Sequence, residues 1–175
     1  MQLRRVARAQ GGGAAVEFAL IAPVMVLLYC GLAELSLGMM AERRAAHATS
    51  IVADLVAQTT SMNASQMTDI FSVADAILQP FPTAPLKIRV TSVKADSYGS
   101  PKVVWSQGHS FGALGAGGTV SGMLSGLLAA NESIIMAELN YAYDTPLHYA
   151  VPTGMSFHQT FYLKPRKSPE VVWGP

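Results

Sequence analysis

A long apolar run lies near the start of the chain. No residue between positions 18 and 33 is charged, and Glu17 and Glu34 stand at its two ends. A helix needs about 20 mostly apolar residues to cross the hydrocarbon core of a bilayer. The pattern therefore predicts a transmembrane helix over residues 13–41. Pro23 lies inside it, and we expect a bend there because proline removes one backbone hydrogen bond.

Helical periodicity continues past this run. Val52, Leu55 and Val56 recur at spacings of three and four residues and mark one apolar helix face. We therefore expect one helix over residues 14–58, about 65 Å long at about 1.5 Å per residue. A helix of this length protrudes from the membrane, so its second half, residues 42–58, is expected to form one wall of a folded domain.

A second amphipathic helix is predicted over residues 64–79. Asn63 or Ser65 can cap its start, and the helix ends before Pro80. Its apolar stripe, at spacings of three and four, consists of Met67, Ile70, Phe71, Ala74, Ile77 and Leu78. The connector that follows, residues 79–85, contains three prolines and is expected to be rigid.

From residue 86 the apolar period changes to two, which is typical of strands with one buried face. Residues 86–164 are predicted to form a roughly four-stranded antiparallel sheet with one apolar and one wet face. The first strand begins at residue 86, and the others lie at 102–107, 134–143 and 156–164. The helices are expected to cover the apolar face.

Two segments show no regular period. Residues 108–131 are rich in glycine and are predicted to form a long loop with one short helical turn. Residues 165–175 are predicted to form a surface tail, although Val171, Val172 and Trp173 could also dock as a short edge strand. The predicted fold class is α+β, in which a long N-terminal transmembrane helix continues into a domain over residues 42–175.

Composition narrows the possible functions. The 175 residues carry a formal net charge of +1, which gives no support to nucleic-acid binding. Cys30 is the only cysteine, so an internal disulfide and a cysteine-rich metal site are excluded. The four histidines are scattered without ligand spacing, and no catalytic signature is present. We therefore expect no enzyme, no cofactor and no metal.

The first 12 residues carry Arg4, Arg5 and Arg8 and no acid. By the positive-inside rule this end stays in the cytoplasm, and residues 42–175 lie on the other side of the membrane. A secretory signal peptide begins in a similar way, but its apolar core is shorter and a break follows it. The pattern therefore favours a membrane anchor over a removed secretion signal.

The residues at the start of the apolar run form a motif. Gly12 is followed by four residues and then by Glu17 and Phe18, a pattern that resembles the cleavage motif of type IV-like prepilins. With Ala22-Pro23 and the segment 31–35, the opening third of the chain resembles the TadE/TadG-like minor pilins, or pseudopilins, of the Tad (Flp) pilus system. Beyond Ser50 only the architecture, a long helix followed by a small sheet, is compatible with this family.

The resemblance implies that a prepilin peptidase cuts between Gly12 and Gly13 and removes the basic leader, residues 1–12. Glu17 then becomes the fifth residue of the mature chain. The implied partners are the peptidase, other pilin-like subunits, the inner-membrane assembly platform and the lipid bilayer.

Physical chemistry gives Glu17 a role of its own. An acid beside an apolar run needs a partner, and the cut would create one in the α-amino group of Gly13. The alternative is an acid at the membrane border, solvated by headgroups. Glu34 can likewise mark the outer border or pair with a basic group in an assembly. Gly31 and Gly38 can permit close packing of helices, although they can also be mere filler.

The sequence thus predicts a single-pass protein of the bacterial inner membrane, with a cytoplasmic N-terminus and a periplasmic α+β domain. Its expected function is that of a minor pilin or pseudopilin in Tad pilus assembly, which can end with incorporation into an extracellular pilus. The alternative is an uncleaved, membrane-anchored periplasmic scaffold or binding protein. The mature N-terminus distinguishes the two.

Overall fold

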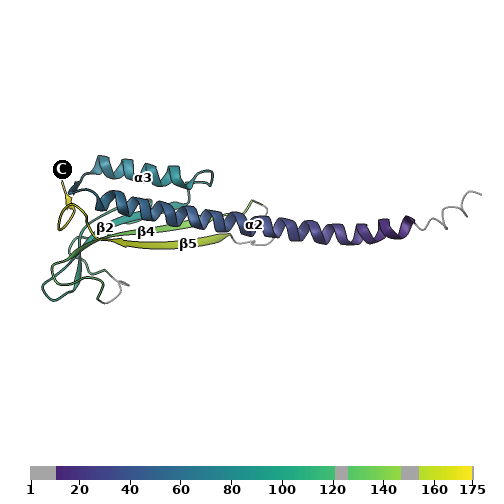
Figure 1. Cartoon of the computed structure of the whole chain (residues 1–175). Helices are drawn as coiled ribbons and strands as arrows, with labels where there is room; N and C mark the ends of the chain where they lie inside the picture. The colour runs from purple at the N-terminus through teal and green to yellow at the C-terminus, as the bar shows by residue number, and fades with distance from the viewer. Residues whose placement is uncertain (1–10, 121–125, 147–153, 175) are drawn as a thin grey trace, which may run out of the picture.

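One helix, α2 (Gly11–Ala57), organises the molecule. The computed structural model describes residues 11–120, 126–146 and 154–174. Figure 1 shows α2 as a rod whose second half carries a second helix and a sheet, while its first half projects alone. The other elements are β1 (Ser61–Met62), α3 (Ala64–Leu78), β2 (Leu86–Ala95), β3 (Pro101–His109), β4 (Ser133–Tyr143), β5 (Met155–Leu163) and β6 (Val172–Trp173).

The helix α2 is continuous over 47 residues and runs through Pro23 without interruption. Its second half buries small side chains at helical spacing, namely those of Ala41, Ala45, Ala48 and Val52. Because these side chains are short, the sheet and α3 can both approach the helix backbone closely. The continuous helix predicted over residues 14–58 is confirmed, except that it already begins at Gly11.

The second helix, α3, confirms its predicted stripe and cap. Asn63 accepts a hydrogen bond from Gln66 N at 2.9 Å, and the Gln66 side chain accepts one from Asn63 N at 3.1 Å. This capping box satisfies two backbone donors at the start of the helix. Four members of the stripe are buried, namely Met67, Phe71, Ala74 and Leu78.

The end of α3 is tied to α2 by Arg44. This side chain donates to the carbonyl oxygens of Ile77, at 3.1 Å, and of Gln79. A cation at this position also interacts favourably with the negative end of the helix dipole. Arg44 therefore fixes where α3 ends along α2.

The four main strands form an antiparallel sheet in the order β3-β2-β4-β5. Its inner face packs on α2 and includes Ile88, Val90, Leu139 and Tyr141, all buried in the main core. The strand β5 starts near Gly38, and just beyond its end Arg166 N donates to Ala57 O at 2.8 Å. The strand therefore runs alongside α2 in the same direction, and the α+β prediction is confirmed.

The sequence predicted that the outer face of the sheet is wet, but part of this face is buried. At the end of the sheet far from the exposed half of α2, Val93, Val103 and Met136 form a second buried cluster. Val120 and Leu128, from the loop predicted over 108–131, complete it. The loop folds back because Val103 N donates to Gly118 O at 2.9 Å. The predicted helical turn falls partly on residues 121–125, outside the described residues.

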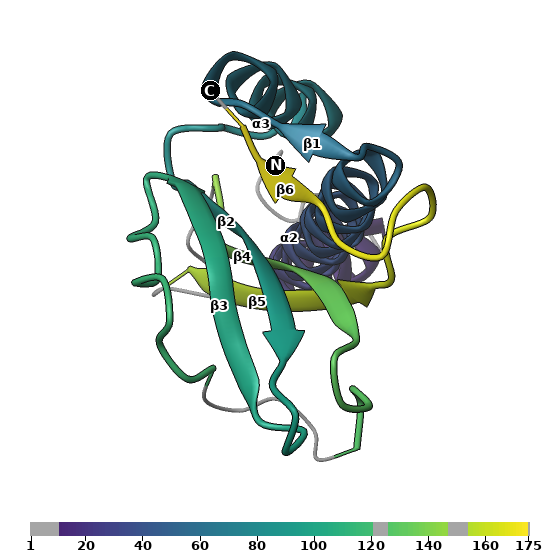
Figure 2. The same cartoon turned by 90° about the vertical axis from the view of Figure 1, so that its left-hand side faces the viewer.

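The C-terminal segment docks on the domain and does not form a free tail. β6 pairs with β1 in parallel, so the alternative of a short docked strand is confirmed, although in a separate two-stranded sheet (Figure 2). Trp105 donates through Nε1 to Val171 O at 2.7 Å, and its ring lies 5.2 Å from that of Trp173. These contacts close the far end of the core.

Candidate functional site

The first half of α2 is a candidate membrane span. An 18-residue window of this helix has a mean hydropathy of 2.1, and none of the window is buried. Among the described residues no other helix is long and apolar enough to cross a membrane. The exposed large side chains in the first half of α2 include Val16, Phe18, Leu20, Ile21, Val24, Met25, Val26, Leu27, Leu28, Tyr29 and Leu32. An apolar surface of this extent marks a site that lipid or other helices cover.

The predicted processing residues lie together in the first turns of α2. Gly12 and Gly13 are helical, and a methyl group placed on either would meet no described atom within 4 Å beyond its chain neighbours and the backbone of its own helix. Packing within the subunit therefore does not require these two glycines. The helix was predicted to start at residue 13 or 14, but it begins at Gly11. Each glycine weakens a helix by about 1 kcal/mol relative to alanine, so this turn is easily unwound.

Glu17 and Phe18 are both exposed, and Phe18 is 72% accessible. Within the described ranges Glu17 forms no ion pair. Its carboxylate lies one helical turn after Gly13, the residue whose α-amino group the predicted cut would create. An acid is also favoured near a helix N-terminus, by about 0.3–1 kcal/mol when exposed.

Glu34 lies where the exposed half of α2 ends. Its side chain is fully buried, at 0% exposure. Burial, and then the charges of Glu34 and Asp144, raise the pKa of Tyr143. The two roles predicted for Glu34, border acid or assembly partner, stay predictions, and the structure adds that its side chain is enclosed beside Tyr143, at the end of β4.

The two glycines proposed to permit helix packing have different surroundings. Gly38 is buried against the start of β5, where a methyl group would come within 2.8 Å of the Met155 sulfur. Its small size therefore serves the contact between α2 and its own sheet. Gly31 is half-buried in the candidate span. Gly38 needs no second helix to explain it.

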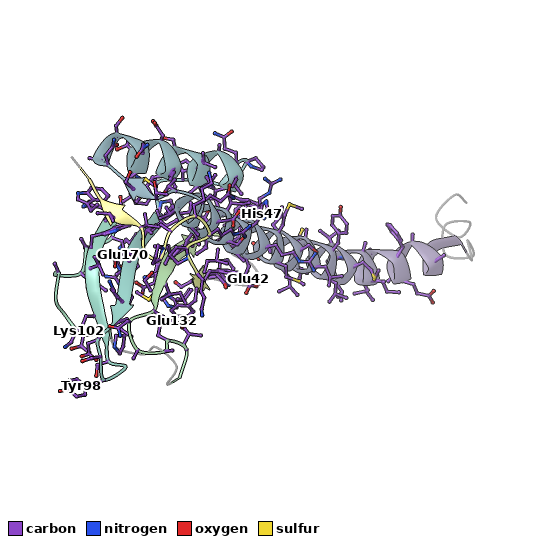
Figure 3. All side chains as sticks on the ribbon, turned by 60° about the vertical axis from the view of Figure 1, so that its left-hand side comes forward. Glu42, His47, Tyr98, Lys102, Glu132 and Glu170 are labelled. Carbon is purple, nitrogen blue, oxygen red and sulfur yellow. The ribbon has the colours of Figure 1, made fainter. Side chains whose placement is uncertain are left out.

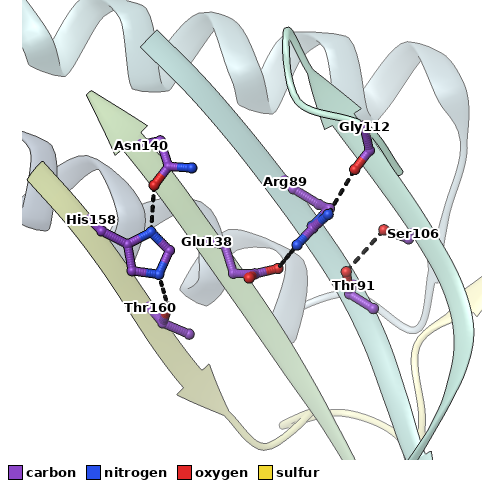
Figure 4. A network of polar contacts seen from close by, with 8 residues as sticks. All are labelled: Arg89, Thr91, Ser106, Gly112, Glu138, Asn140, His158 and Thr160. Carbon is purple, nitrogen blue, oxygen red and sulfur yellow. Dashed lines mark hydrogen bonds and ion pairs between the residues drawn. The ribbon is translucent and has the colours of Figure 1, made fainter. Parts of the chain in front are cut away.

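A polar network covers the outer face of the sheet beside the second cluster (Figure 4). Arg89 donates through Nε to Glu138 Oε2 at 2.8 Å and through Nη1 to Gly112 O at 2.8 Å, and its guanidinium lies 4.3 Å from the Phe111 ring centroid. The two ion-pair side chains are only 13% and 15% exposed. Each charge is matched within the fold, so the network is suited to hold the loop after β3.

Sequence reasoning missed this network. Arg89 lies on β2 and Glu138 on the neighbouring strand β4, and only the register of these two strands places the residues directly opposite each other. The alternation of charged and apolar residues in each strand puts both on the outer face, but it does not fix the register. The described residues contain no cluster of three or more histidine, cysteine, aspartate or glutamate side chains suited to a metal ion.

Comparisons with known proteins agree with the motif. Residues 12–54 match the family model of the TadE-like proteins. Searches of curated proteins and of solved structures gave no match. The matched segment contains the exposed half of α2 and most of the half that carries the domain. Over residues 12–54 the chain is therefore similar to the TadE-like proteins.

Proposed function

We propose that this protein is a minor pilin, or pseudopilin, that takes part in assembling a Tad pilus after a prepilin peptidase cuts between Gly12 and Gly13. The observation that carries the proposal is the division of α2 into two halves. The exposed apolar half begins at the motif Gly12, Glu17 and Phe18 and lies within the TadE-like segment, while the other half supports a domain.

The length of the exposed half supports membrane insertion before assembly. Residues 12–33 span about 33 Å at about 1.5 Å per residue. The hydrocarbon core of a bilayer is about 30 Å thick. The same surface can later pack against the helices of other pilin-like subunits, which replace lipid around it. In this proposal the protein acts by binding partners and not by catalysis.

The continuity of α2 supports transfer of the whole subunit. The apolar half and the domain share one helix, and Arg44, Gly38 and the alanines of the second half join α3 and the sheet to it. A force that moves the apolar half out of the membrane therefore moves the domain as one body. The assembly platform of the inner membrane is the proposed source of that force.

Processing is proposed at the glycines because they have no packing role in the subunit and form a weak helical turn. The cut leaves a positive α-amino group on Gly13, at a helix end whose dipole is already positive. Glu17 compensates this charge within the same subunit or from a neighbour. The basic leader stays in the cytoplasm and the domain lies in the periplasm.

The test is a Gly12→Ile variant expressed with the peptidase. A bulky residue before the cut is expected to block leader removal, so the intact mass retains residues 1–12. Ala15→Ile is the matched control, because it adds a similar bulk to the same exposed turn and should be processed normally. Removal of the leader from Gly12→Ile at the same bond would refute the proposed processing site.

The second candidate is an anchored scaffold that is never cut. The second half of α2, which packs on the domain along one side, fits either function, since both need a rigid connection between anchor and domain. An unprocessed wild-type chain in cells with an active peptidase would favour this scaffold.

A further inference from the structure

We propose that the domain rests directly on the membrane, with its near end in the lipid headgroup layer. The contact surface, here called the foot, consists of the free side of α2 at Leu35, Met39 and Met40 and the exposed residues Pro80, Pro82 and Ala84 of the connector between α3 and β2. This inference rests on the membrane anchoring within the proposed function, but not on processing or pilus assembly.

The first observation is that α2 has two different sides between residues 34 and 41. Glu34, Gly38 and Ala41 are buried by the domain, whereas Leu35, Met39 and Met40 are 49%, 49% and 48% exposed. The free side carries no charge from residue 18 to residue 41, and its next residues are the exposed Glu42 and Arg43. These 24 residues span about 36 Å, which exceeds the hydrocarbon thickness of about 30 Å. The apolar surface therefore reaches the level of the domain.

The second observation is the depth of Glu34. It lies 17 residues after Glu17, which corresponds to about 25 Å along the helix. If Glu17 marks the inner border, Glu34 falls within the hydrocarbon layer, where an uncovered charge is costly. In this structure the domain covers Glu34 completely, with Tyr143 beside it. The end of the domain must therefore reach to this depth on one side of α2.

The third observation is the composition of the connector. Residues 79–85 carry no charge, and the side chains of Pro80, Pro82 and Ala84 are exposed. The connector is held at the near end of the sheet, because Tyr141 Oη donates to Pro82 O at 2.9 Å and the Phe81 ring lies 5.5 Å from that of Tyr143. Figure 1 shows this connection at the end of the domain that faces the exposed half of α2.

The orientation of the domain follows from these contacts. β2 starts beside Tyr141 and runs away from the foot, so the turn between β2 and β3 lies at the opposite end. Tyr98, 93% exposed in this turn, is far from the exposed half of α2 in Figure 3. The domain thus stands on the bilayer with its strands along α2, without a flexible stalk.

The test uses the full chain with Cys30→Ser, carrying one new cysteine at Met40, Ala84 or Tyr98 and labelled with an environment-sensitive fluorophore. Each labelled protein is reconstituted into phosphatidylethanolamine and phosphatidylglycerol vesicles, with and without a lipid that carries a nitroxide on its headgroup. The labels at Met40 and Ala84 are expected to lose fluorescence in the nitroxide vesicles, and the label at Tyr98 is expected to keep it.

The proposal would be overturned if the labels at Ala84 and Tyr98 both kept their fluorescence in the nitroxide vesicles, since a domain held away from the bilayer leaves both labels in water. If the label at Ala84 loses fluorescence but the chain retains its leader in cells with the peptidase, the foot is supported and pilin processing is rejected. If the leader is removed but the label at Ala84 keeps its fluorescence, processing is supported and the foot is rejected. The two proposals therefore fail separately.

Discussion

Gly38 of α2 and Met155 of β5 are in direct contact, and a methyl group on Gly38 would come within 2.8 Å of the Met155 sulfur and 3.9 Å of Tyr143 Cε1. The contact joins the rod to the sheet just above the exposed half of α2. It lies one helical turn beyond the buried Glu34.

Gly38→Leu is expected to destabilise the domain by about 1–3 kcal/mol, the usual cost of overpacking a tight contact. Gly38→Ala should change stability little, because the Met155 side chain can move and alanine favours a helix by about 1 kcal/mol. Urea unfolding of the full chain in detergent measures both. Adding Met155→Ala to Gly38→Leu should recover part of the loss, and no recovery would show that the contact is not the cause.

Because Arg89 and Glu138 form an ion pair, we expect the stability losses from replacing each of them to be non-additive. Glu138→Leu leaves the guanidinium nearly buried with Gly112 O as its one remaining acceptor among the described residues, at an expected cost of about 2–3 kcal/mol. Arg89→Met together with Glu138→Leu should cost less than Glu138→Leu alone, since apolar side chains can replace a buried pair. Unfolding free energies of Glu138→Leu, of Arg89→Met and of the double variant test this, and a loss in the double variant equal to the sum of the two single losses would contradict it.

Tyr141 predicts a fall in stability at high pH. Burial, and then the neighbouring Tyr143, raise the pKa of Tyr141 from 10.0 to about 12. The folded chain therefore holds this proton more tightly than the unfolded chain, so stability is lost as the pH rises from about 10 to about 12. One such group contributes at most about 1.4 kcal/mol per pH unit.

Tyr141→Phe should flatten this pH dependence and also cost about 1 kcal/mol at neutral pH through the lost hydrogen bond to Pro82 O. Tyr98→Phe is the control, because its ring is 93% exposed. Thermal unfolding from pH 8 upward compares them. A Tyr141→Phe curve parallel to that of the wild type would count against the assignment.

Glu17→Ala is expected to separate processing from assembly. The leader should still be removed, because Gly12 and Gly13 are unchanged, but co-purification with other pilin-like subunits should be lost with the charge that compensates the new α-amino group. Glu42→Ala is a matched control, an exposed acid on the same helix outside the apolar half. Normal piliation in the Glu17 variant would support the alternative of a solvated border acid.

The local patterns of the sequence were sufficient for the helices and the main strands. The stripe of α3 from Met67 to Leu78 and the alternation around Ile88 and Val90 each depend on residues close in the chain, and both are confirmed. The similarity to the TadE-like proteins was also readable, because the motif that carries it, Gly12 to Phe18, is a short segment within residues 12–54.

These local patterns could not predict contacts between segments that are far apart in the sequence. Val120 and Leu128 cover the outer face only because the loop after β3 folds back, and no periodicity signals that return. The burial of Glu34 likewise depends on strand ends more than 100 residues away in sequence. An acid after an apolar run suggests a membrane border, and only the folded domain reveals that it is enclosed.

The mature N-terminus of the wild-type chain, isolated from membranes of cells that contain the peptidase, tests the central claim most directly. Intact mass and N-terminal sequencing are expected to give a chain that starts at Gly13, with Glu17 as its fifth residue. A chain that starts at Met1 or Gln2 would contradict the proposed pilin function and favour an uncleaved anchored scaffold.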